Sequence, residues 1–186
     1  GFLDQALRLS MRIFVDAEEP DELSRIYPDY YWDQIVAAAT EAKVDPFLVL
    51  SVIRQESTFN EDAVSRAGAL GLMQIMPQTG SKMANKLGMH RFERRSLFDP
   101  DVSIRLGSYF LGDQVRQFAK GPTRKLGFEL GLAAYNAGPH VTRKWIQRFP
   151  YEDPDAFVER IPFKETRRYV KLVLKNYAIY KILSEV

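Results

Sequence analysis

Apolar residues recur at helical spacing along nearly the whole chain, and alternating runs of strand length are almost absent. Near the N-terminus this spacing links Leu3, Leu7, Met11 and Phe14, which predicts a first helix over residues 3–17. Further helices are expected to begin near residues 31, 46 and 100 and to cover residues 125–135, 141–149 and 165–184. The pattern indicates an all-α fold of about eight helices, with a small irregular or β-like loop between residues 59 and 70.

Two Asp-Pro pairs mark expected helix starts. Asp45 precedes Pro46, and Asp99 precedes Pro100. An aspartate side chain can accept a hydrogen bond from the free N–H groups of the first turn. Proline is tolerated at the first helical position because its missing N–H would have no partner there. Both pairs therefore predict an aspartate cap followed by a helix.

The chain has 186 residues, a length that fits one domain with a short extension. Pro20 and Pro28 punctuate a short polar connection, which is the best candidate for a boundary. We therefore expect a helical linker segment over residues 1–29 and one domain over residues 30–186. Because the chain begins with Gly1 rather than Met, we also expect it to be a piece of a longer protein.

Composition excludes several classes of site. The chain has no cysteine, which excludes disulfides, thiolate nucleophiles and cysteine-ligated metals. The 26 Lys and Arg nearly balance the 24 Asp and Glu, so no nucleic-acid partner is expected. His90 and His140 are isolated, whereas a zinc site needs three or four converging ligands. We therefore expect no metal and no organic cofactor. The strongly apolar stretch at residues 47–53 is also far too short to span a bilayer.

Glu56 is the most informative position. It follows Val49 by seven residues, Val52 by four and Ile53 by three, which puts its carboxyl group on an apolar helix face. No residue three or four positions away in the helix is a cation. Poor solvation raises the pKa of a carboxyl group, and such a group suits a general acid. The alternatives are a frayed terminal residue or an ion pair with a distant arginine such as Arg66.

The segment over residues 65–77 is rich in small residues and then apolar, with the single amide Gln74 inside it. Gly68 and Gly71 permit a tight backbone path or the close approach of a ligand. A buried amide needs hydrogen-bond partners, and the hydroxyl and N-acetyl groups of a sugar could supply them. The alternative is a core loop whose methionines merely fill space.

Two later segments place polar side chains at helix ends. Tyr135 ends an apolar helix face just before residues 136–139, where Gly138 and Pro139 stop the helix. Such a tyrosine can line a cleft or anchor its ring in the core. Glu165 follows Pro162 and begins the last helix, where the helix dipole alone would favour an acid.

These segments together resemble the catalytic domain of the soluble lytic transglycosylases, lysozyme-like enzymes that cut bacterial peptidoglycan. The matching stretches follow the family's order and near-family spacing: residues 44–60 (VDPFLVLSVIRQESTFN), 65–77 (SRAGALGLMQIMP), 133–139 (AAYNAGP) and 157–170 (FVERIPFKETRRYV). The resemblance covers about residues 30–183 and implies a lysozyme-like multi-helix domain. The residues before it resemble the helical linker that joins this domain to a larger N-terminal helical region in such enzymes.

Residue by residue, the resemblance places the family's catalytic acid on Glu56 and the motif serine that orders the site on Ser57. Tyr135 matches a tyrosine close to the acid, and Glu165 matches a second acidic residue in the glycan groove. The full set of expected substrate contacts is Ser57, Ser65, Gln74, Met76, Ala134, Tyr135, Asn136 and Glu165.

The activity that the resemblance implies is cleavage of the β-1,4 bond between N-acetylmuramic acid and N-acetylglucosamine, with 1,6-anhydromuramic acid ends. A single glutamate, Glu56, would act first as acid and then as base, as in glycosidases that use the substrate's own N-acetyl group. Tyr135 would hold Glu56 or the N-acetyl group, while Gln74 and Glu165 would position the sugars.

Two alternatives stay open at this stage. A goose-type-lysozyme-like hydrolase would cut the same bond but add water, and a non-catalytic glycan-binding module would bind without turnover. The expected partners are a peptidoglycan glycan strand and the N-terminal helical region of a longer parent chain, with the protein itself a monomer. The family's substrate implies a periplasmic location, although no signal peptide is visible.

Overall fold

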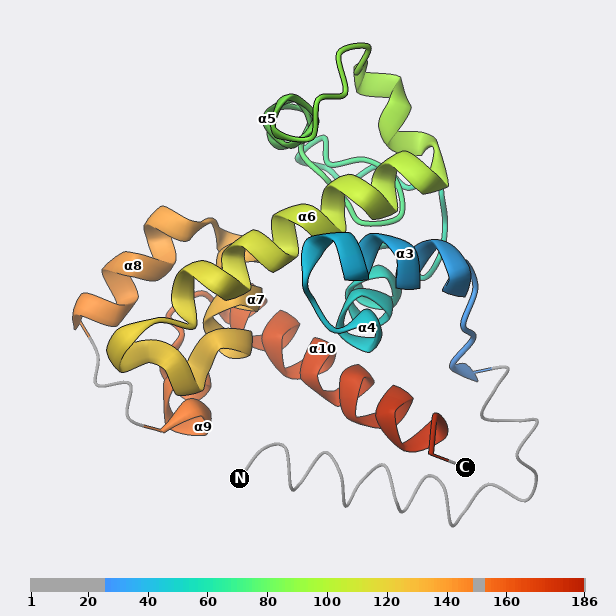
Figure 1. Ribbon diagram of the computed structural model, residues 1–186. Helices are drawn as coiled ribbons and strands as arrows, with labels where there is room; N and C mark the ends of the chain where they lie inside the picture. The colour runs from blue at the N-terminus through green and yellow to red at the C-terminus, as the bar shows by residue number, and fades with distance from the viewer. Residues whose placement is uncertain (1–25, 149–152, 186) are drawn as a thin grey trace. The chain divides into compact units, whose positions relative to one another are not determined.

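The computed structural model describes residues 26–148 and 153–185, so the helix expected over residues 3–17 lies outside the described part (Figure 1). The α-helices are α3 (Trp32–Ala42), α4 (Pro46–Ser57), α5 (Pro77–Lys86), α6 (Pro100–Phe118), α7 (Gly127–Ala137), α8 (Pro139–Arg148), α9 (Pro154–Arg160) and α10 (Lys164–Leu183). Two 3₁₀ helices, η1 (Arg94–Phe98) and η2 (Gly121–Leu126), complete the regular structure. The described residues contain no named strand, which confirms the all-α prediction.

Both predicted aspartate caps are present. The Asp45 carboxylate accepts a 2.9 Å hydrogen bond from the Phe47 backbone N–H at the start of α4. The Asp99 carboxylate accepts a 3.1 Å bond from the Val102 N–H at the start of α6. In each case the proline is the first helical residue, as the sequence predicts.

Helices α5 and α9 were not predicted by apolar spacing. Only Gly80, Met83 and Ala84 of α5 are buried, and α9 has only seven residues. Such short or sparsely buried helices carry too few apolar positions for a period to stand out. The start of α9 nevertheless repeats the aspartate cap, because the Asp153 carboxylate accepts a 3.0 Å bond from the Ala156 N–H.

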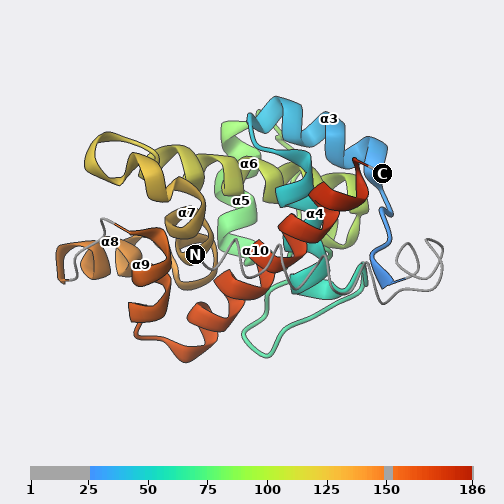
Figure 2. The same ribbon diagram turned by 90° about the horizontal axis from the view of Figure 1, so that it is seen from below.

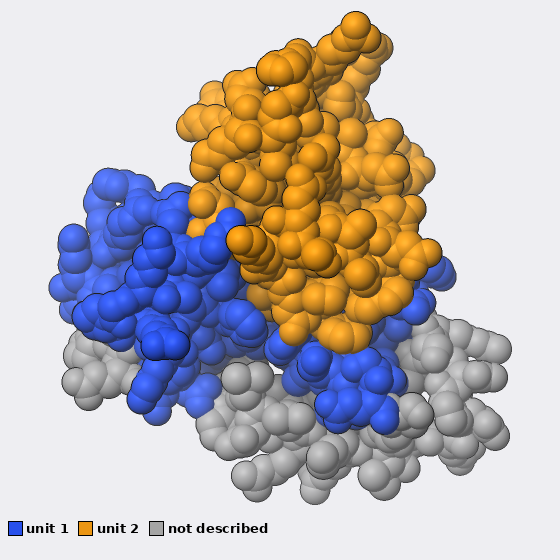
Figure 3. Space-filling model, viewed as in Figure 1, with its two compact units in different colours: residues 1–30, 114–186 blue, residues 31–113 orange. Residues whose placement is uncertain are grey.

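The predicted β-like loop follows α4. Leu70 forms isolated antiparallel bridges with Val64 and with Ile75, so the loop folds back on itself twice without forming a sheet. This loop and α5 lie in the same compact unit as α4, which extends over residues 31–113 (Figure 3).

The second compact unit contains residues 1–30 and 114–186, of which 26–30, 114–148 and 153–185 are described. Within it, α7 and α9 pack against α10, and α8 packs against α7 (Figure 2). Near the other end of α10, the Tyr180 hydroxyl donates a 2.9 Å bond to the Pro28 carbonyl. The expected division into residues 1–29 and 30–186 stays a prediction, because most of the first segment lies outside the described residues.

Candidate active site

Glu56 lies in the last turn of α4 and is half-buried. The helix is firmly held there, because Val49, Val52 and Ile53 on the predicted apolar face are completely buried. Thr58 ends the helix in a left-handed conformation with φ of 51°, and its N–H bonds the Arg54 carbonyl. The carboxyl group is therefore carried by a rigid helix end at the boundary between core and solvent.

Ser57 is the last residue of α4 and is half-buried. Its hydroxyl donates a 3.2 Å hydrogen bond to the Ile53 carbonyl one turn earlier. This bond fixes the side chain against its own helix, next to Glu56. A serine oxygen that donates one bond still has lone pairs for accepting another, so Ser57 can also serve as an acceptor for a sugar hydroxyl.

Ser65 closes the first turn of the loop that follows α4. Its backbone N–H donates to the Ala69 carbonyl at 2.9 Å, and its side-chain oxygen accepts from the Ala69 N–H at 2.9 Å. Gly68 completes this turn with φ of 88°, a conformation that suits glycine. The Ser65 hydroxyl proton is not used in that pair of bonds and can be donated to a ligand.

Gln74 organises the loop. Its amide nitrogen donates 2.9 Å hydrogen bonds to the carbonyls of both Ala63 and Gly71, and its backbone has φ of 47°. Two carbonyl acceptors require the NH₂ end of the amide, which fixes the orientation of the group. The loop backbone thus supplies hydrogen-bond partners that a buried amide at this position was predicted to need. What remains for a ligand is the amide oxygen of this half-buried side chain.

The loop is fastened to α6 through small residues. The Met73 N–H donates a 3.3 Å bond to the Ser103 hydroxyl, which is fully buried. A Cβ at Gly107 would come within 2.3 Å of the Met73 sulfur, so only glycine permits this approach. Met76 follows as the residue before α5 and stays 42% exposed. The loop therefore offers a rigid wall that ends in an exposed, polarisable side chain.

Within the other unit, the structure joins two predicted motifs. The Thr166 hydroxyl donates a 2.7 Å hydrogen bond to the side-chain oxygen of Asn136. Tyr135, beside Asn136, is half-buried, Ala134 is fully buried and Glu165, beside Thr166, is exposed. The C-terminal end of α7 and the first turn of α10 are thus tied together next to the predicted contacts Tyr135 and Glu165.

Sequence reasoning missed one buried acid, Glu129, in the first turn of α7. Its side chain is only 6% exposed, and burial raises the pKa of its carboxyl group, with the nearby Asp155 adding to the effect. The helical spacing could have predicted this burial, because Leu132 and Ala133 lie three and four residues after Glu129 on a buried helix face. Glu129 lines a cavity of about 350 Å³ between the end of α6, η2 and α7.

Among residues 26–148 and 153–185, no three His, Asp or Glu side chains cluster in a way that could hold a metal ion. None of the helices in this part of the chain combines the length and apolar character needed to cross a membrane.

Comparison with known proteins identifies two family models along the chain. The transglycosylase SLT domain matches residues 33–158, and the soluble lytic transglycosylase helical domain matches residues 160–185. The soluble lytic murein transglycosylase of Escherichia coli K12 is 33% identical over 183 residues. The membrane-bound lytic murein transglycosylase C of Edwardsiella ictaluri is 31% identical and matches 79% of this chain and 46% of its own length.

Solved structures agree with this assignment. An inactive glutamate-to-glutamine mutant of lytic transglycosylase Slt from Pseudomonas aeruginosa matches 98% of this chain with a TM-score of 0.79 and 33% identity. The complex of the 70-kDa soluble lytic transglycosylase with bulgecin A matches 100% of this chain with a TM-score of 0.81 and 32% identity. This chain spans only 30% and 29% of the length of those two proteins. The match to the Escherichia coli relative covers 97% of this chain but 27% of that relative.

Proposed function

This chain belongs to the soluble lytic transglycosylase family, and from that premise we propose that it is a peptidoglycan lytic transglycosylase. The proposed reaction cleaves the β-1,4 bond between N-acetylmuramic acid and N-acetylglucosamine and leaves 1,6-anhydromuramic acid ends. The observation that carries the proposal is the position of Glu56 on the rigid end of α4, between a fully buried helix face and solvent. The inactive glutamate-to-glutamine mutant of the Pseudomonas aeruginosa relative supports an essential glutamate in the family.

In the first step, protonated Glu56 donates its proton to the glycosidic oxygen. The bond between that oxygen and the anomeric carbon of the muramic acid breaks, and the N-acetylglucosamine part leaves with a hydroxyl group. The oxygen of the substrate's own N-acetyl group stabilises the positive charge that develops on the muramic acid ring. One carboxyl group is then sufficient, as in substrate-assisted glycosidases.

In the second step, the Glu56 carboxylate accepts the proton of the muramic acid C6 hydroxyl. The C6 oxygen bonds to the anomeric carbon of the same sugar, which gives the 1,6-anhydro ring and returns Glu56 to its protonated form. No water is consumed. Because both reacting groups belong to one sugar, the step is effectively unimolecular, which is a large kinetic advantage.

The remaining predicted residues are proposed as substrate contacts. Ser57 and Ser65 each retain hydrogen-bonding capacity beyond their bonds to the backbone, and Gln74 retains its amide oxygen. Met76 offers an exposed apolar surface to a sugar face. Ala134, Tyr135, Asn136 and Glu165 are proposed to contact the glycan from the ends of α7 and α10, which the Thr166 bond holds together.

Two further points concern the longer protein that contains this chain and its place in the cell. Since the relatives are much longer than this chain, we propose that it acts as the catalytic part of a longer protein with an N-terminal helical region. A peptidoglycan substrate places that protein at the cell wall, which in Gram-negative bacteria lies in the periplasm.

Mass spectrometry of the products from purified sacculi tests the function. A lytic transglycosylase releases muropeptides with anhydro ends, which lack the mass of one water relative to hydrolysed ends. Products that carry the additional water would identify a goose-type-lysozyme-like hydrolase of the same bond. Sacculi that bind the protein but release no soluble muropeptides would identify a non-catalytic glycan-binding module.

A further inference from the structure

Residues 82–95, which we call the basic segment, concentrate positive charge. They include five Lys or Arg and a single acid, Glu93, whereas the whole chain has a formal net charge of only +2. The rest of the chain, taken together, is therefore net negative. The segment runs from the middle of α5 into η1, within the unit that carries Glu56.

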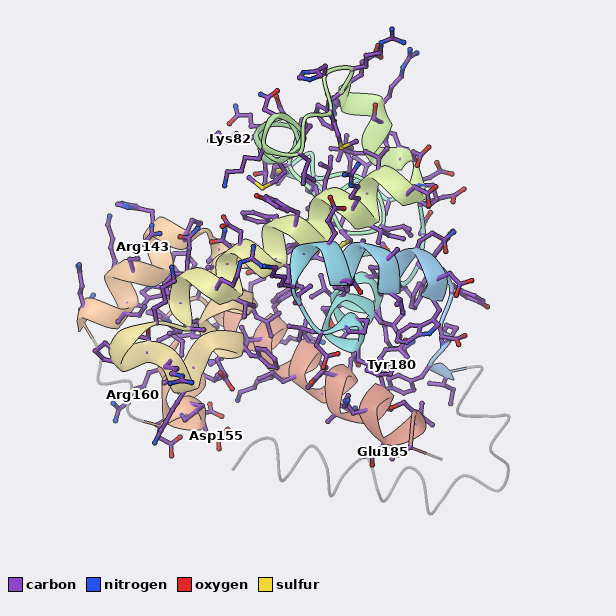
Figure 4. The ribbon with its side chains drawn as sticks, in the orientation of Figure 1. Lys82, Arg143, Asp155, Arg160, Tyr180 and Glu185 are labelled. Carbon is purple, nitrogen blue, oxygen red and sulfur yellow. The ribbon has the colours of Figure 1, made fainter. Side chains whose placement is uncertain are left out.

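All the charged side chains of the basic segment are exposed. Arg95 pairs with Glu93 at 2.8 Å, and Lys86 pairs with Asp113 at 3.5 Å. The other three cations make no ion pair or hydrogen bond with any residue of the described ranges: Lys82, Arg91 and Arg94. Figure 4 shows the Lys82 side chain extending outward from α5. Three cations are thus available to an anionic ligand.

The backbone that carries these cations is firmly fixed. The Phe92 ring packs so closely on α5 that a Cβ at Gly80 would lie 2.8 Å from it. Leu97, two residues after the segment, is completely buried and lies 3.2 Å from where a Cβ at Gly80 would be. The Glu93 N–H donates to the Ser96 hydroxyl at 3.3 Å, and the Ser96 N–H donates to the Glu93 carbonyl at 2.9 Å. Because this backbone is already ordered, the protein loses less conformational entropy when a ligand binds.

A concave site lies within this surface. A cavity of about 400 Å³ is lined by Met89, His90, Arg91, Phe92, Ser96 and Val102. Its lining contains a guanidinium, an imidazole and a hydroxyl group, and no acid. A guanidinium binds a carboxylate through two parallel hydrogen bonds. The volume is within the range of small-ligand sites and fits one or two amino-acid residues.

We propose that the basic segment binds the free carboxylates of the peptides that hang from the peptidoglycan glycan strand. This proposal rests on the proposed function, because it adds a peptide contact to a glycan-cutting site. Membrane binding is disfavoured, since interfacial segments insert apolar side chains and no large exposed hydrophobic residue of the described ranges lies within residues 82–95. Discrete acidic groups on a flexible peptide match separate, exposed cations better than a flat lipid surface does.

Co-sedimentation with two forms of the same polymer tests the proposal. One form is native sacculi, and the other is sacculi whose carboxyl groups have been converted to neutral amides. All proteins carry Glu56→Gln so that the polymer is not degraded. We expect the parent protein to bind native sacculi about five- to tenfold more tightly than amidated sacculi, with the difference shrinking at high salt.

The double variant Arg91→Glu with Arg94→Glu is expected to lose that preference. Its matched control is Arg124→Glu with Lys144→Glu, two exposed cations outside the segment that change the net charge equally. Retention of the preference by the first variant, or its loss by both, would overturn the proposal. So would a parent protein that binds both polymers equally.

A third arm uses vesicles that contain anionic lipid. Vesicle binding that depends on Arg91 and Arg94, together with sacculus binding that does not, would replace the peptide by a membrane as the ligand. Because the measurement is binding, it is independent of product analysis. Failure of the cleavage reaction and failure of the peptide contact therefore give different results.

Discussion

The hydroxyl group of Thr166 donates a 2.7 Å hydrogen bond to the side-chain oxygen of Asn136, across thirty residues of sequence. Thr166 is 2% exposed, and Asn136 is half-buried. The bond joins the first turn of α10 to the last turn of α7. It therefore fastens together the two helix ends that carry the proposed glycan contacts Tyr135 and Glu165.

Thr166→Val tests the importance of that bond. The substitution keeps the shape of the side chain but leaves the Asn136 oxygen without its donor, at a cost of about 1 kcal/mol in the free energy of unfolding. For a protein of this size, that corresponds to a melting temperature lower by roughly 2–4 °C. We also expect kcat/KM on sacculi to fall about three- to tenfold, because the contacts on either side of the bond lose their fixed positions.

The matched control is Thr142→Val on α8. Thr142 is also fully buried, but its hydroxyl bonds the Gly138 carbonyl one turn earlier in the chain. This variant is expected to change stability by a similar amount while kcat/KM stays near that of the parent. Equal activity losses in the two variants would show that the Thr166 bond has no specific role in positioning.

Glu56→Gln is expected to remove turnover while leaving the fold intact. The amide has the same size as the acid but cannot transfer a proton, and a well-placed acid contributes about 10²- to 10⁴-fold to the rate. Release of soluble muropeptides should therefore drop by at least that lower factor, with an unchanged melting temperature and unchanged sacculus binding. Asp62→Asn, at an exposed acid shortly after α4, serves as the control and should keep full activity. A fully active Glu56→Gln protein would exclude Glu56 as the acid.

Local signals predicted local structure well in this chain. The caps at Asp45 and Asp99 depend only on the residues that follow them, so the sequence pattern was sufficient. The apolar face that precedes Glu56 was equally visible, because helical spacing places Val52 and Ile53 on one side. These features needed no knowledge of the rest of the fold.

Partners that are distant in sequence could not be predicted in this way. Nothing in the spacing shows that Thr166 meets Asn136, or that Ser103 meets Met73, since both pairs depend on how whole helices pack. Gln74 is an intermediate case. Its need for partners was predicted, but the identity of those partners depended on the path of the loop backbone.

Gln74→Glu is expected to weaken the loop wall. A carboxylate has no N–H group to donate, so it would face the Ala63 and Gly71 carbonyls with like partial charge. Loss of these bonds should cost about 1–3 kcal/mol of stability near neutral pH, and cleavage of sacculi should slow. The control is Gln78→Glu, the same substitution on the exposed face of α5. Thermal unfolding and muropeptide release measure both effects, and a Gln74→Glu protein that matches its control would argue against the structural role of the amide.

Glu129→Gln should make the protein more stable, in a way that depends on pH. Burial raises the pKa of Glu129 above its ordinary value of 4.5. Between pH 4.5 and the raised pKa, the folded protein binds more protons than the unfolded chain does. The contribution of Glu129 to stability therefore falls as pH rises through this interval. The neutral amide avoids that loss. The difference in unfolding free energy between variant and parent should be near zero below pH 4.5, grow as pH rises through the raised pKa, and then stay constant.

Chemical denaturation of both proteins at several pH values between 4 and 8 measures this difference. Glu185→Gln, which removes an exposed acid just after α10, is the control for the loss of one carboxyl group. A constant difference across the pH range would mean that Glu129 titrates alike in the folded and unfolded chains. A difference that grows toward low pH would mean that the Glu129 carboxylate is stabilised by a partner, because only a lowered pKa makes the ionised form favour the folded state.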